Sequence, residues 1–230
     1  MVTTRLEKGF EMIWVAEIGS AHNGSKAQAF EMIRQAKLAG ATIAKFQFGW
    51  TDDAQFKYTG AYRDVRYIDE WAEDLAKWCK HFDIELMASI WSMEGLEVAR
   101  KVGMKRYKIA HQMDDVWLIT EMAKDNKETF WSNPPKGQGN YRDLFCSEDY
   151  PAFPGAWIPL ERDFEEYYGY SSHMHGYADA LIAVARGAQY IEKHVTLNKA
   201  DVALRDNSFA LSFEEFGEMT RIGNEMAWLR

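Results

Sequence analysis

Two apolar segments near the start of this chain carry polar side chains toward their carboxyl ends. Glu17 lies in the first segment, and the turn after it brings His22 and Asn23. In the second segment Lys45 and Gln47 alternate with phenylalanines, so on a strand both polar side chains face the same side. A carboxylate within an apolar strand is costly to bury without a partner, and Lys45 is the obvious partner. Polar residues at the carboxyl ends of successive parallel strands are typical of a (β/α)-barrel active site, which predicts an enzyme.

The later strands add hydroxyl groups and two more lysines. These candidates are Ser89, Lys108, Ser132, Ser171 and Lys193. Lysines on three different predicted strands, with hydroxyl groups between them, are expected to converge on one rim of a barrel. Such a collection of donors suits a small dianion such as a phosphate ester.

Histidines follow two of the predicted strands. His173 and His175 are one residue apart, so on a strand both could point the same way and ligate a divalent metal. Alternatively, only one faces the site while the other caps a turn or meets solvent, and His173 is favoured because it lies nearer the strand end. His111 follows the fourth predicted strand and could serve as an acid or base, because the pKa of histidine lies near neutrality.

Strands and helices alternate along the chain with almost no linker. Apolar runs and alternation predict strands over 13–19, 42–48, 84–90, 106–110, 128–132, 143–147, 168–172 and 189–196. Helical spacing of apolar residues predicts helices over 26–39, 68–81, 93–102, 115–125, 177–187 and 213–229. Repeated units of this kind imply parallel strands with right-handed crossovers.

Two of the expected helices are missing from this pattern. The segment 133–140 contains two prolines and two glycines and cannot form a helix. The segment 149–166 has three prolines and leaves room for about one helical turn near 160–166. We therefore predict a (β/α)8 TIM barrel with the helices after strands 5 and 6 lost or shortened. An open doubly wound sheet is the alternative. The flank left bare could be a subunit interface of a homodimer, because barrel strands need covering.

Length and charge limit the class of protein. The 230 residues suit one domain over 1–230, and the net charge of −8 argues against nucleic acid or an anionic membrane as a partner. No apolar run approaches the length that crosses a membrane. Cys79 and Cys146 are the only cysteines and stand in no metal-ligand spacing, which predicts a reducing, cytoplasmic location.

Several short motifs follow one another in a specific order. They are Ala16-Glu17-Ile18-Gly19 with His22-Asn23-Gly24, then Lys45-Phe46-Gln47, Tyr107-Lys108-Ile109-Ala110, Gly169-Tyr170-Ser171-Ser172-His173 and Glu192-Lys193-His194-Val195-Thr196-Leu197. This set resembles the N-acetylneuraminate (sialic acid) synthase family, whose catalytic domain is a (β/α)8 barrel. The resemblance implies condensation of phosphoenolpyruvate with the open-chain aldehyde of an N-acyl hexosamine such as N-acetylmannosamine. A divalent metal, Mn²⁺ or Mg²⁺, would polarise the aldehyde, water would add at the pyruvyl carbon, and phosphate would leave.

The resemblance also implies roles for individual residues. Glu17 would act near the attacking water or carry a proton, and His173 would ligate the metal. The phosphate and carboxylate of phosphoenolpyruvate would be held by Lys45, Ser89, Lys108 and Ser132, with Lys193 adding positive charge at the same rim. The remaining residues expected to bind substrate are Asn23, Gln47, His111 and Ser171. Asp206 falls where the family has an acidic residue after the last strand.

The chain departs from the family pattern at its predicted metal and sugar sites. Phe145 takes the place of the family's second metal-binding histidine at the end of strand 6, and phenylalanine cannot bind a metal. A rebuilt site would draw on His173 with His175, His111 or Glu148. After strand four, His111 and Met113 replace a serine and an acidic residue of the family. We also expect no small C-terminal antifreeze-like domain.

These observations favour a sialic acid synthase-like enzyme that uses phosphoenolpyruvate and an amino-sugar aldehyde to make a nonulosonic acid. Two alternatives remain open. One is a different sugar-phosphate enzyme on the same barrel, with His111 as its acid or base. The other is a catalytically inactive homologue that binds a phosphate ligand. A requirement for phosphoenolpyruvate would distinguish the synthase from the first alternative. Ligand binding without turnover would identify the second alternative.

Overall fold

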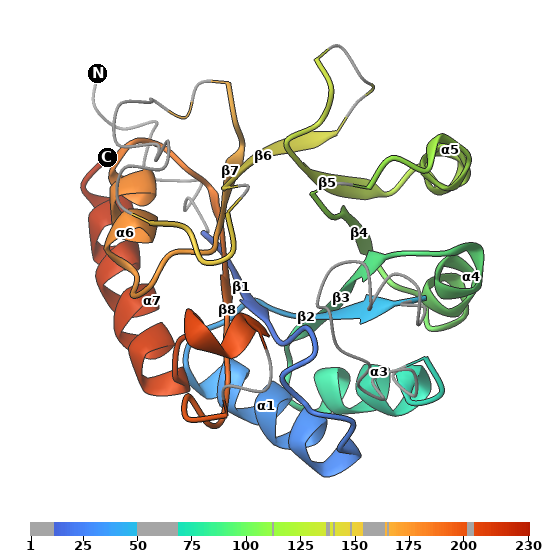
Figure 1. Ribbon diagram of the computed structural model, residues 1–230, viewed down its shortest axis with the longest axis horizontal. Coiled ribbons are helices and arrows are strands. Elements are labelled where there is room, and N and C mark those ends of the chain that lie inside the picture. Colours follow the sequence, from blue (N-terminus) through green and yellow to red (C-terminus); the bar gives the residue numbers. More distant parts are fainter. Residues whose placement is uncertain are drawn as a thin grey trace, which may run out of the picture.

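Eight parallel strands close into a barrel in chain order, with β8 paired to β1. The computed structural model describes residues 12–49, 69–111, 113–136, 139, 141–147, 149–153, 164, 166–201 and 205–230. Figure 1 looks along the ring of strands. The strands are β1 (Ile13–Glu17), β2 (Ile43–Phe48), β3 (Glu85–Ile90), β4 (Arg106–Ile109), β5 (Glu128–Ser132), β6 (Arg142–Cys146), β7 (Gly169–Ser172) and β8 (Tyr190–His194). The closed ring confirms the predicted TIM barrel, and the open doubly wound sheet is wrong.

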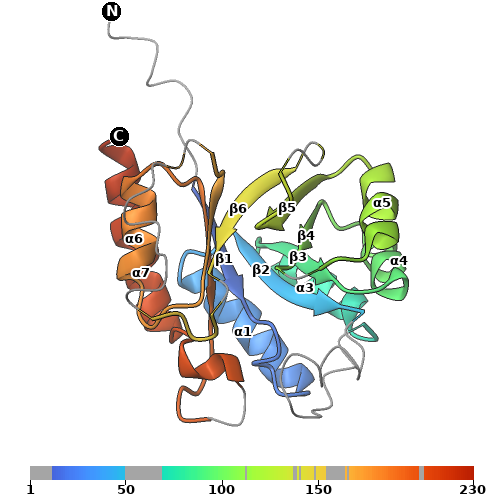
Figure 2. The same cartoon turned by 45° about the horizontal axis from the view of Figure 1, so that its top comes forward.

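The helices cover the outside of this ring. They are α1 (Lys26–Leu38), α3 (Ala72–His81), α4 (Met93–Lys101), α5 (Val116–Lys124), α6 (Ala178–Ala185) and α7 (Phe213–Trp228), with a short 3₁₀ helix η3 (Arg205–Ser208) after β8. Side-chain oxygens of Ser25, Ser92, Asp115 and Ser212 accept from a backbone N–H in the first turn of α1, α4, α5 and α7. Such caps fix where each helix begins. Figure 2 shows α6 and α7 on one side of the barrel and α3, α4 and α5 on the other.

Alternation along the strands divides the barrel interior into an apolar base and a polar layer above it. The base is formed by Val15, Ile43, Met87, Phe130, Leu144 and Tyr190. Two positions further along the same strands stand Glu17, Lys45, Ser89, Ser132, Cys146 and Glu192. Side chains two apart on a strand share a face, so every one of these polar groups sits directly above apolar packing. The apolar base closes the barrel to water from its amino end and holds the polar layer at the carboxyl end.

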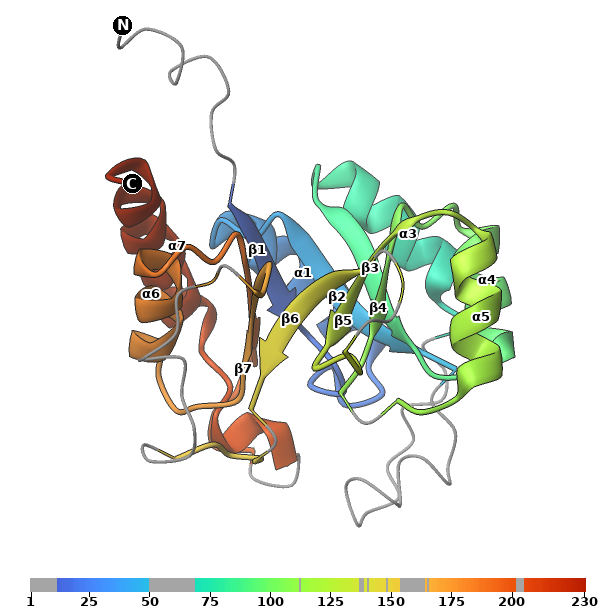
Figure 3. The same ribbon diagram turned by 90° about the horizontal axis from the view of Figure 1, so that it is seen from above.

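The connection from β5 to β6 contains no helix among its described residues, as predicted. Aromatic side chains cover this flank instead. Tyr141 packs edge-on against Trp131 with ring centroids 5.1 Å apart, and Tyr167 packs against Phe145 at 5.6 Å. Figure 3 shows β6 and β7 between α5 and α6, which lie on opposite sides of the molecule. The turn predicted near 160–166 falls almost entirely outside the described residues.

The predicted elements match the observed ones to within one to three residues at most ends, and the predicted start of the helix at 68–81 lies four residues early. The predicted strands over 13–19 and 189–196 run two residues too far: the chain turns at Gly19, and Val195 leaves the barrel ladder to form an isolated bridge with Leu211. Among the described residues, none of the helices has the length and apolar character needed to cross a bilayer.

Candidate active site

A buried cluster of charges forms the centre of the polar layer. Lys45 Nζ lies 2.9 Å from Glu17 Oε2 and 3.3 Å from Glu192 Oε1, and all three side chains are buried. Lys45 also donates to Ser89 Oγ at 3.0 Å. Burial disfavours the charged form of Lys45, but the two carboxylates hold its pKa above the usual value. The predicted pairing of Glu17 with Lys45 is confirmed, and Glu192 is a second acidic partner.

The pKa values of the two carboxylates in this cluster are shifted in opposite directions. Burial raises the pKa of Glu17, and the nearby negative charge of Glu192 adds to that effect. Burial also favours a higher pKa for Glu192. This effect is outweighed by the charges of Lys45 and Lys108 and by hydrogen bonds from Tyr190 and Ser171, which bring the pKa down to about 2. Neighbouring titratable groups whose pKa values are pushed apart are typical of acid–base sites.

Lys108 is the second cation inside the barrel. Its Nζ donates to Ser132 Oγ and to the carbonyl of Ile109, both at 2.8 Å. Burial lowers the pKa of Lys108 to about 8. Lys108 is paired in register with Ser89, the hydroxyl partner of Lys45. The structure therefore brings two lysines and two serines of the predicted phosphate site together on β2 to β5.

His173 faces the same interior from the end of β7. Its Nδ1 lies 3.3 Å from the carbonyl of Ser147 and 3.8 Å from Cys146 Sγ. Burial, together with the charge of His194, lowers the pKa of His173 well below its usual value, so the imidazole is neutral near pH 7. The ring of Tyr150 covers it at a centroid distance of 3.8 Å.

Of the four other predicted residues, Gln47 and Ser171 contact the buried glutamates directly. Gln47 is half-buried and donates to Glu17 Oε1 at 3.3 Å. Ser171 Oγ donates to Glu192 Oε1 at 2.8 Å. His111 is half-buried at the rim, with Nδ1 3.4 Å from Asn133 Nδ2. Asn23 is exposed in the turn after β1, where its φ of 51° suits an asparagine.

Lys193 is not part of the interior cluster, so the prediction of three converging lysines is wrong. Its Nζ donates to Ser172 Oγ at 3.0 Å and to the carbonyl of Met174 at 2.6 Å. Burial lowers the pKa of Lys193 to about 8, with the charge of Asp179 on α6 acting against that shift. Because Glu192 faces inward, its neighbour Lys193 must face the helices.

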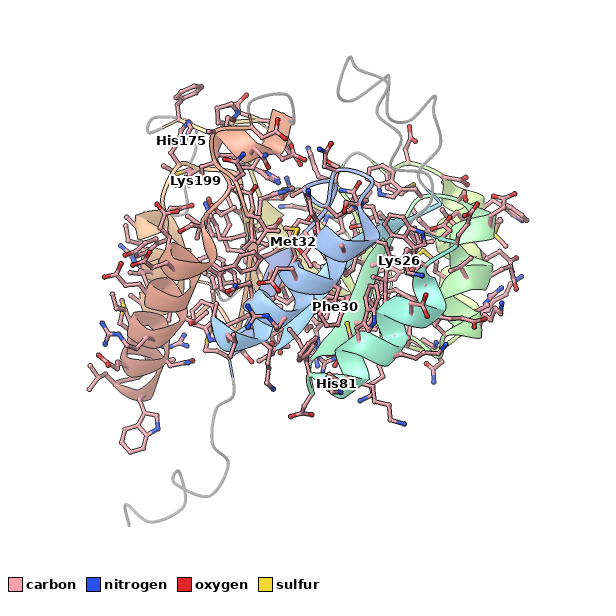
Figure 4. The ribbon with its side chains drawn as sticks, turned by 90° about the horizontal axis from the view of Figure 1, so that it is seen from below. Lys26, Phe30, Met32, His81, His175 and Lys199 are labelled. Carbon is pink, nitrogen blue, oxygen red and sulfur yellow. The ribbon has the colours of Figure 1, made fainter. Side chains whose placement is uncertain are left out.

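His175 does not share the buried position of His173. His175 is exposed beyond β7, and Figure 4 shows it near Lys199 at one end of the molecule, opposite His81. Phe145 packs outside the barrel against Tyr167 and Tyr170, and Glu148 lies outside the described residues. Within the part of the chain that the structure describes, no three His, Cys, Asp or Glu side chains are arranged to hold a metal ion. The described residues alone do not fit a metal centre, so no chemical step proposed below passes through one.

The sequence prediction missed three interior residues, Glu192, His194 and Cys146. Their alternation with Ile191, Lys193 and Phe145 was visible, but a run of polar residues does not show which members face inward. His194 Nδ1 lies 3.9 Å from Asp206 Oδ2, and its ring lies 5.5 Å from that of His173. The apolar residue two positions earlier, such as Leu144 before Cys146, was the available signal for the inward phase.

Buried lysines, glutamates and hydroxyl groups at the carboxyl rim of a closed (β/α)8 barrel are typical of the active site of a barrel enzyme. The NeuB family matches residues 26–133 and 135–227 of this chain. The chain belongs to the NeuB family.

Individual relatives agree with this assignment. The pseudaminic acid synthase of Campylobacter jejuni is 27% identical over 89% of this chain and 71% of its own length. The N-acetylneuraminate-9-phosphate synthase of Homo sapiens is 24% identical over 90% of this chain and 68% of its own. Among solved structures, the N-acetylneuraminic acid synthetase of Leptospira borgpetersenii superposes with a TM-score of 0.80 at 22% identity, covering 95% of this chain and 85% of that one. The relatives named for an activity are thus sugar-acid synthases.

Proposed function

We propose that this chain condenses phosphoenolpyruvate with an N-acyl hexosamine aldehyde, such as N-acetylmannosamine, to form a nonulosonic acid and inorganic phosphate. The observation that carries the proposal is the pair Lys45 and Lys108, buried with Ser89 and Ser132 above the apolar base of the barrel. Two ammonium groups and two hydroxyls in a water-poor site suit the phosphate and carboxylate of phosphoenolpyruvate. Family membership supports this class of reaction.

The proposed chemistry forms one carbon–carbon bond and one carbon–oxygen bond to water, and it breaks the carbon–oxygen bond to phosphate. The methylene carbon of phosphoenolpyruvate attacks the aldehyde carbon, whose oxygen takes up a proton. Water then adds to the cationic pyruvyl carbon and loses a proton, and phosphate leaves as that carbon becomes a ketone. Lys45 and Lys108 neutralise the phosphate and carboxylate. Glu17, whose pKa is raised by burial, serves the proton transfers.

Phosphate release from phosphoenolpyruvate tests this proposal. We expect release that needs both phosphoenolpyruvate and N-acetylmannosamine, and that is lost in Lys108→Met. The matched control is Lys105→Met, an exposed lysine at the amino end of β4, which should retain activity. Parallel reactions with Mn²⁺, Mg²⁺ and EDTA read out the metal requirement that the family resemblance predicts. Phosphoenolpyruvate binding without turnover on any aldose would instead identify a binding protein.

We also propose a homodimer in the cytoplasm. On α5, beside the flank that lacks a helix, Val116 is 75% exposed and Trp117 is 61% exposed, and exposed apolar groups of this size favour association. Cys79 and Cys146 are buried free thiols, which suits a reducing compartment. Light scattering of the purified chain measures the mass, and a monomeric mass would contradict the dimer.

A further inference from the structure

From the barrel interior we infer that Glu192 is a positioning residue: it stays ionised, anchors Lys45, and leaves Glu17 as the carboxyl group that exchanges protons with substrate. This inference rests on the proposed function for its role in catalysis. The different protonation behaviour of the two carboxyl groups around Lys45 can be measured without any turnover.

Glu192 accepts two hydrogen bonds and forms an ion pair with Lys45, and these three partners come from three strands. Tyr190 donates to Oε2 at 2.5 Å and Ser171 donates to Oε1 at 2.8 Å, while Lys45 Nζ lies 3.3 Å from Oε1. Tyr190 is itself fixed in the apolar base, where its ring packs 4.6 Å from that of Phe130. Hydrogen bonds to the charged form stabilise that form, so both oxygens of Glu192 are committed to an ionised carboxylate.

Glu17 accepts one hydrogen bond from the described residues, where Glu192 accepts two, although Lys45 lies closer to Glu17. Gln47 donates to Oε1 at 3.3 Å. Oε2 lies 2.9 Å from Lys45 Nζ, but no described group donates a well-directed hydrogen bond to it. A buried carboxyl oxygen in this state is free to take up a proton or to accept one from a bound substrate. Gln47 and Glu17 also lie nearer the open rim than Tyr190, which belongs to the closed base.

The surrounding charges favour the same assignment. The titratable groups that face this pair from the other strands are Lys45 on β2, Lys108 on β4, Cys146 on β6, His173 after β7 and Tyr190 and His194 on β8. Lys45 is shared by both carboxylates, whereas Lys108 acts most strongly on Glu192. With one cation between two acids, the acid with fewer donors is the one that protonates.

Titration of the glutamate side chains by NMR tests the inference directly. The carboxyl carbons of Glu17 and Glu192 are assigned with Glu17→Gln and Glu192→Gln in the full chain. In the wild type we expect Glu17 to titrate above its usual range and Glu192 to remain ionised while the protein stays folded. In Glu192→Gln the Glu17 midpoint should fall by about one pH unit, because a like charge has been removed beside it. Glu128→Gln, at the amino end of β5 and paired with Arg142, is the control and should leave the Glu17 midpoint unchanged.

A second variant keeps the inference testable if Glu192→Gln does not fold. Tyr190→Phe removes only the hydroxyl that anchors Glu192, and Glu192 should then begin to titrate at higher pH. If the wild-type chain is active, the limb of its pH–rate profile that reports Glu17 should move with the NMR midpoint in Glu192→Gln. An unchanged Glu17 midpoint, or a Glu192 that titrates above Glu17, would overturn the inference. Loss of turnover in the wild type with the expected titrations would contradict the proposed function alone.

Discussion

Lys45 is the residue on which the buried charges of this site depend. It lies between two buried carboxylates, so Lys45→Met leaves Glu17 without its cation and Glu192 with Lys108 alone. We expect loss of phosphoenolpyruvate turnover and a decrease of about 3–5 kcal/mol in the free energy of unfolding.

The stability loss in Lys45→Met should depend on pH. The pKa of Glu17 is already raised by burial, and without the lysine it rises further, so the folded protein binds more protons than the unfolded chain. The free energy of unfolding then falls as pH rises from the unfolded pKa through the raised folded pKa. Urea unfolding near pH 5 and pH 8 measures this difference, which we expect to be larger at the higher pH. Adding Glu17→Gln should restore part of the stability, and full additivity of the two changes would contradict the pairing.

Lys108 should set the upper pH limit of ligand binding. Burial lowers its pKa to about 8, so its charge is lost above that pH. Because the ligand then loses one cationic partner, we expect the affinity for phosphoenolpyruvate to fall progressively above about pH 8. Calorimetric titrations at several pH values measure this dependence.

Lys193 provides a matched comparison, because its pKa is also lowered to about 8 by burial. Its ammonium group lies outside the barrel, on Ser172 and Met174. Lys193→Met should therefore keep the pH dependence of phosphoenolpyruvate binding, whereas Lys108→Met should abolish it. If Lys193→Met instead abolished the pH dependence and Lys108→Met kept it, Lys193 would be the lysine that binds phosphoenolpyruvate.

At the scale of the strand, neighbouring positions of β6 lie on opposite faces of the barrel wall. The family resemblance places a metal-binding histidine at Phe145, but this side chain packs among aromatic rings outside the barrel. Phe145→His should therefore not raise Mn²⁺ affinity, and it should destabilise the fold by about 1–3 kcal/mol through burial of a polar ring. Cys146→His places an imidazole on the inner face, where Cys146 Sγ now lies 3.8 Å from His173 Nδ1. Calorimetry with Mn²⁺ should detect tighter binding only in this second variant, and tighter binding to Phe145→His would contradict the observed face of β6.

At the scale of the whole molecule, α7 fastens the end of the chain to the first strand. Trp14 of β1 donates to Asn224 at 2.8 Å, and a Cβ on Gly223 would lie 2.3 Å from the Trp14 ring. We expect Gly223→Ala to destabilise the protein by about 1–3 kcal/mol through overpacking. Gly217 on the same helix has ordinary space, with its nearest neighbour at 3.6 Å, so Gly217→Ala should stabilise it by about 0.5–1 kcal/mol. Thermal unfolding compares the two, and equal effects would show that α7 does not pack tightly on Trp14.

The sequence by itself determined the number, order and approximate bounds of the strands, because each is an apolar run closed by turn residues. It also placed six polar groups at one rim of the barrel, because each lies in the carboxyl-terminal half of a predicted apolar strand or just after it: Glu17, Lys45, Ser89, Lys108, Ser132 and His173. Local pattern is sufficient for these features, because a strand with one apolar face has only one favourable orientation.

Only the tertiary structure decided the faces of Glu192, Lys193 and His194, and of Phe145 against Cys146. Polar runs and mixed ends have no apolar phase, so their orientation is set by register with β1 and β7. The sharing of Lys45 between Glu17 and Glu192 is likewise a contact between β1, β2 and β8, far apart in sequence. Closure of the barrel brings these strands together, and long-range pairing of this kind cannot be deduced from the spacing of residues along one strand.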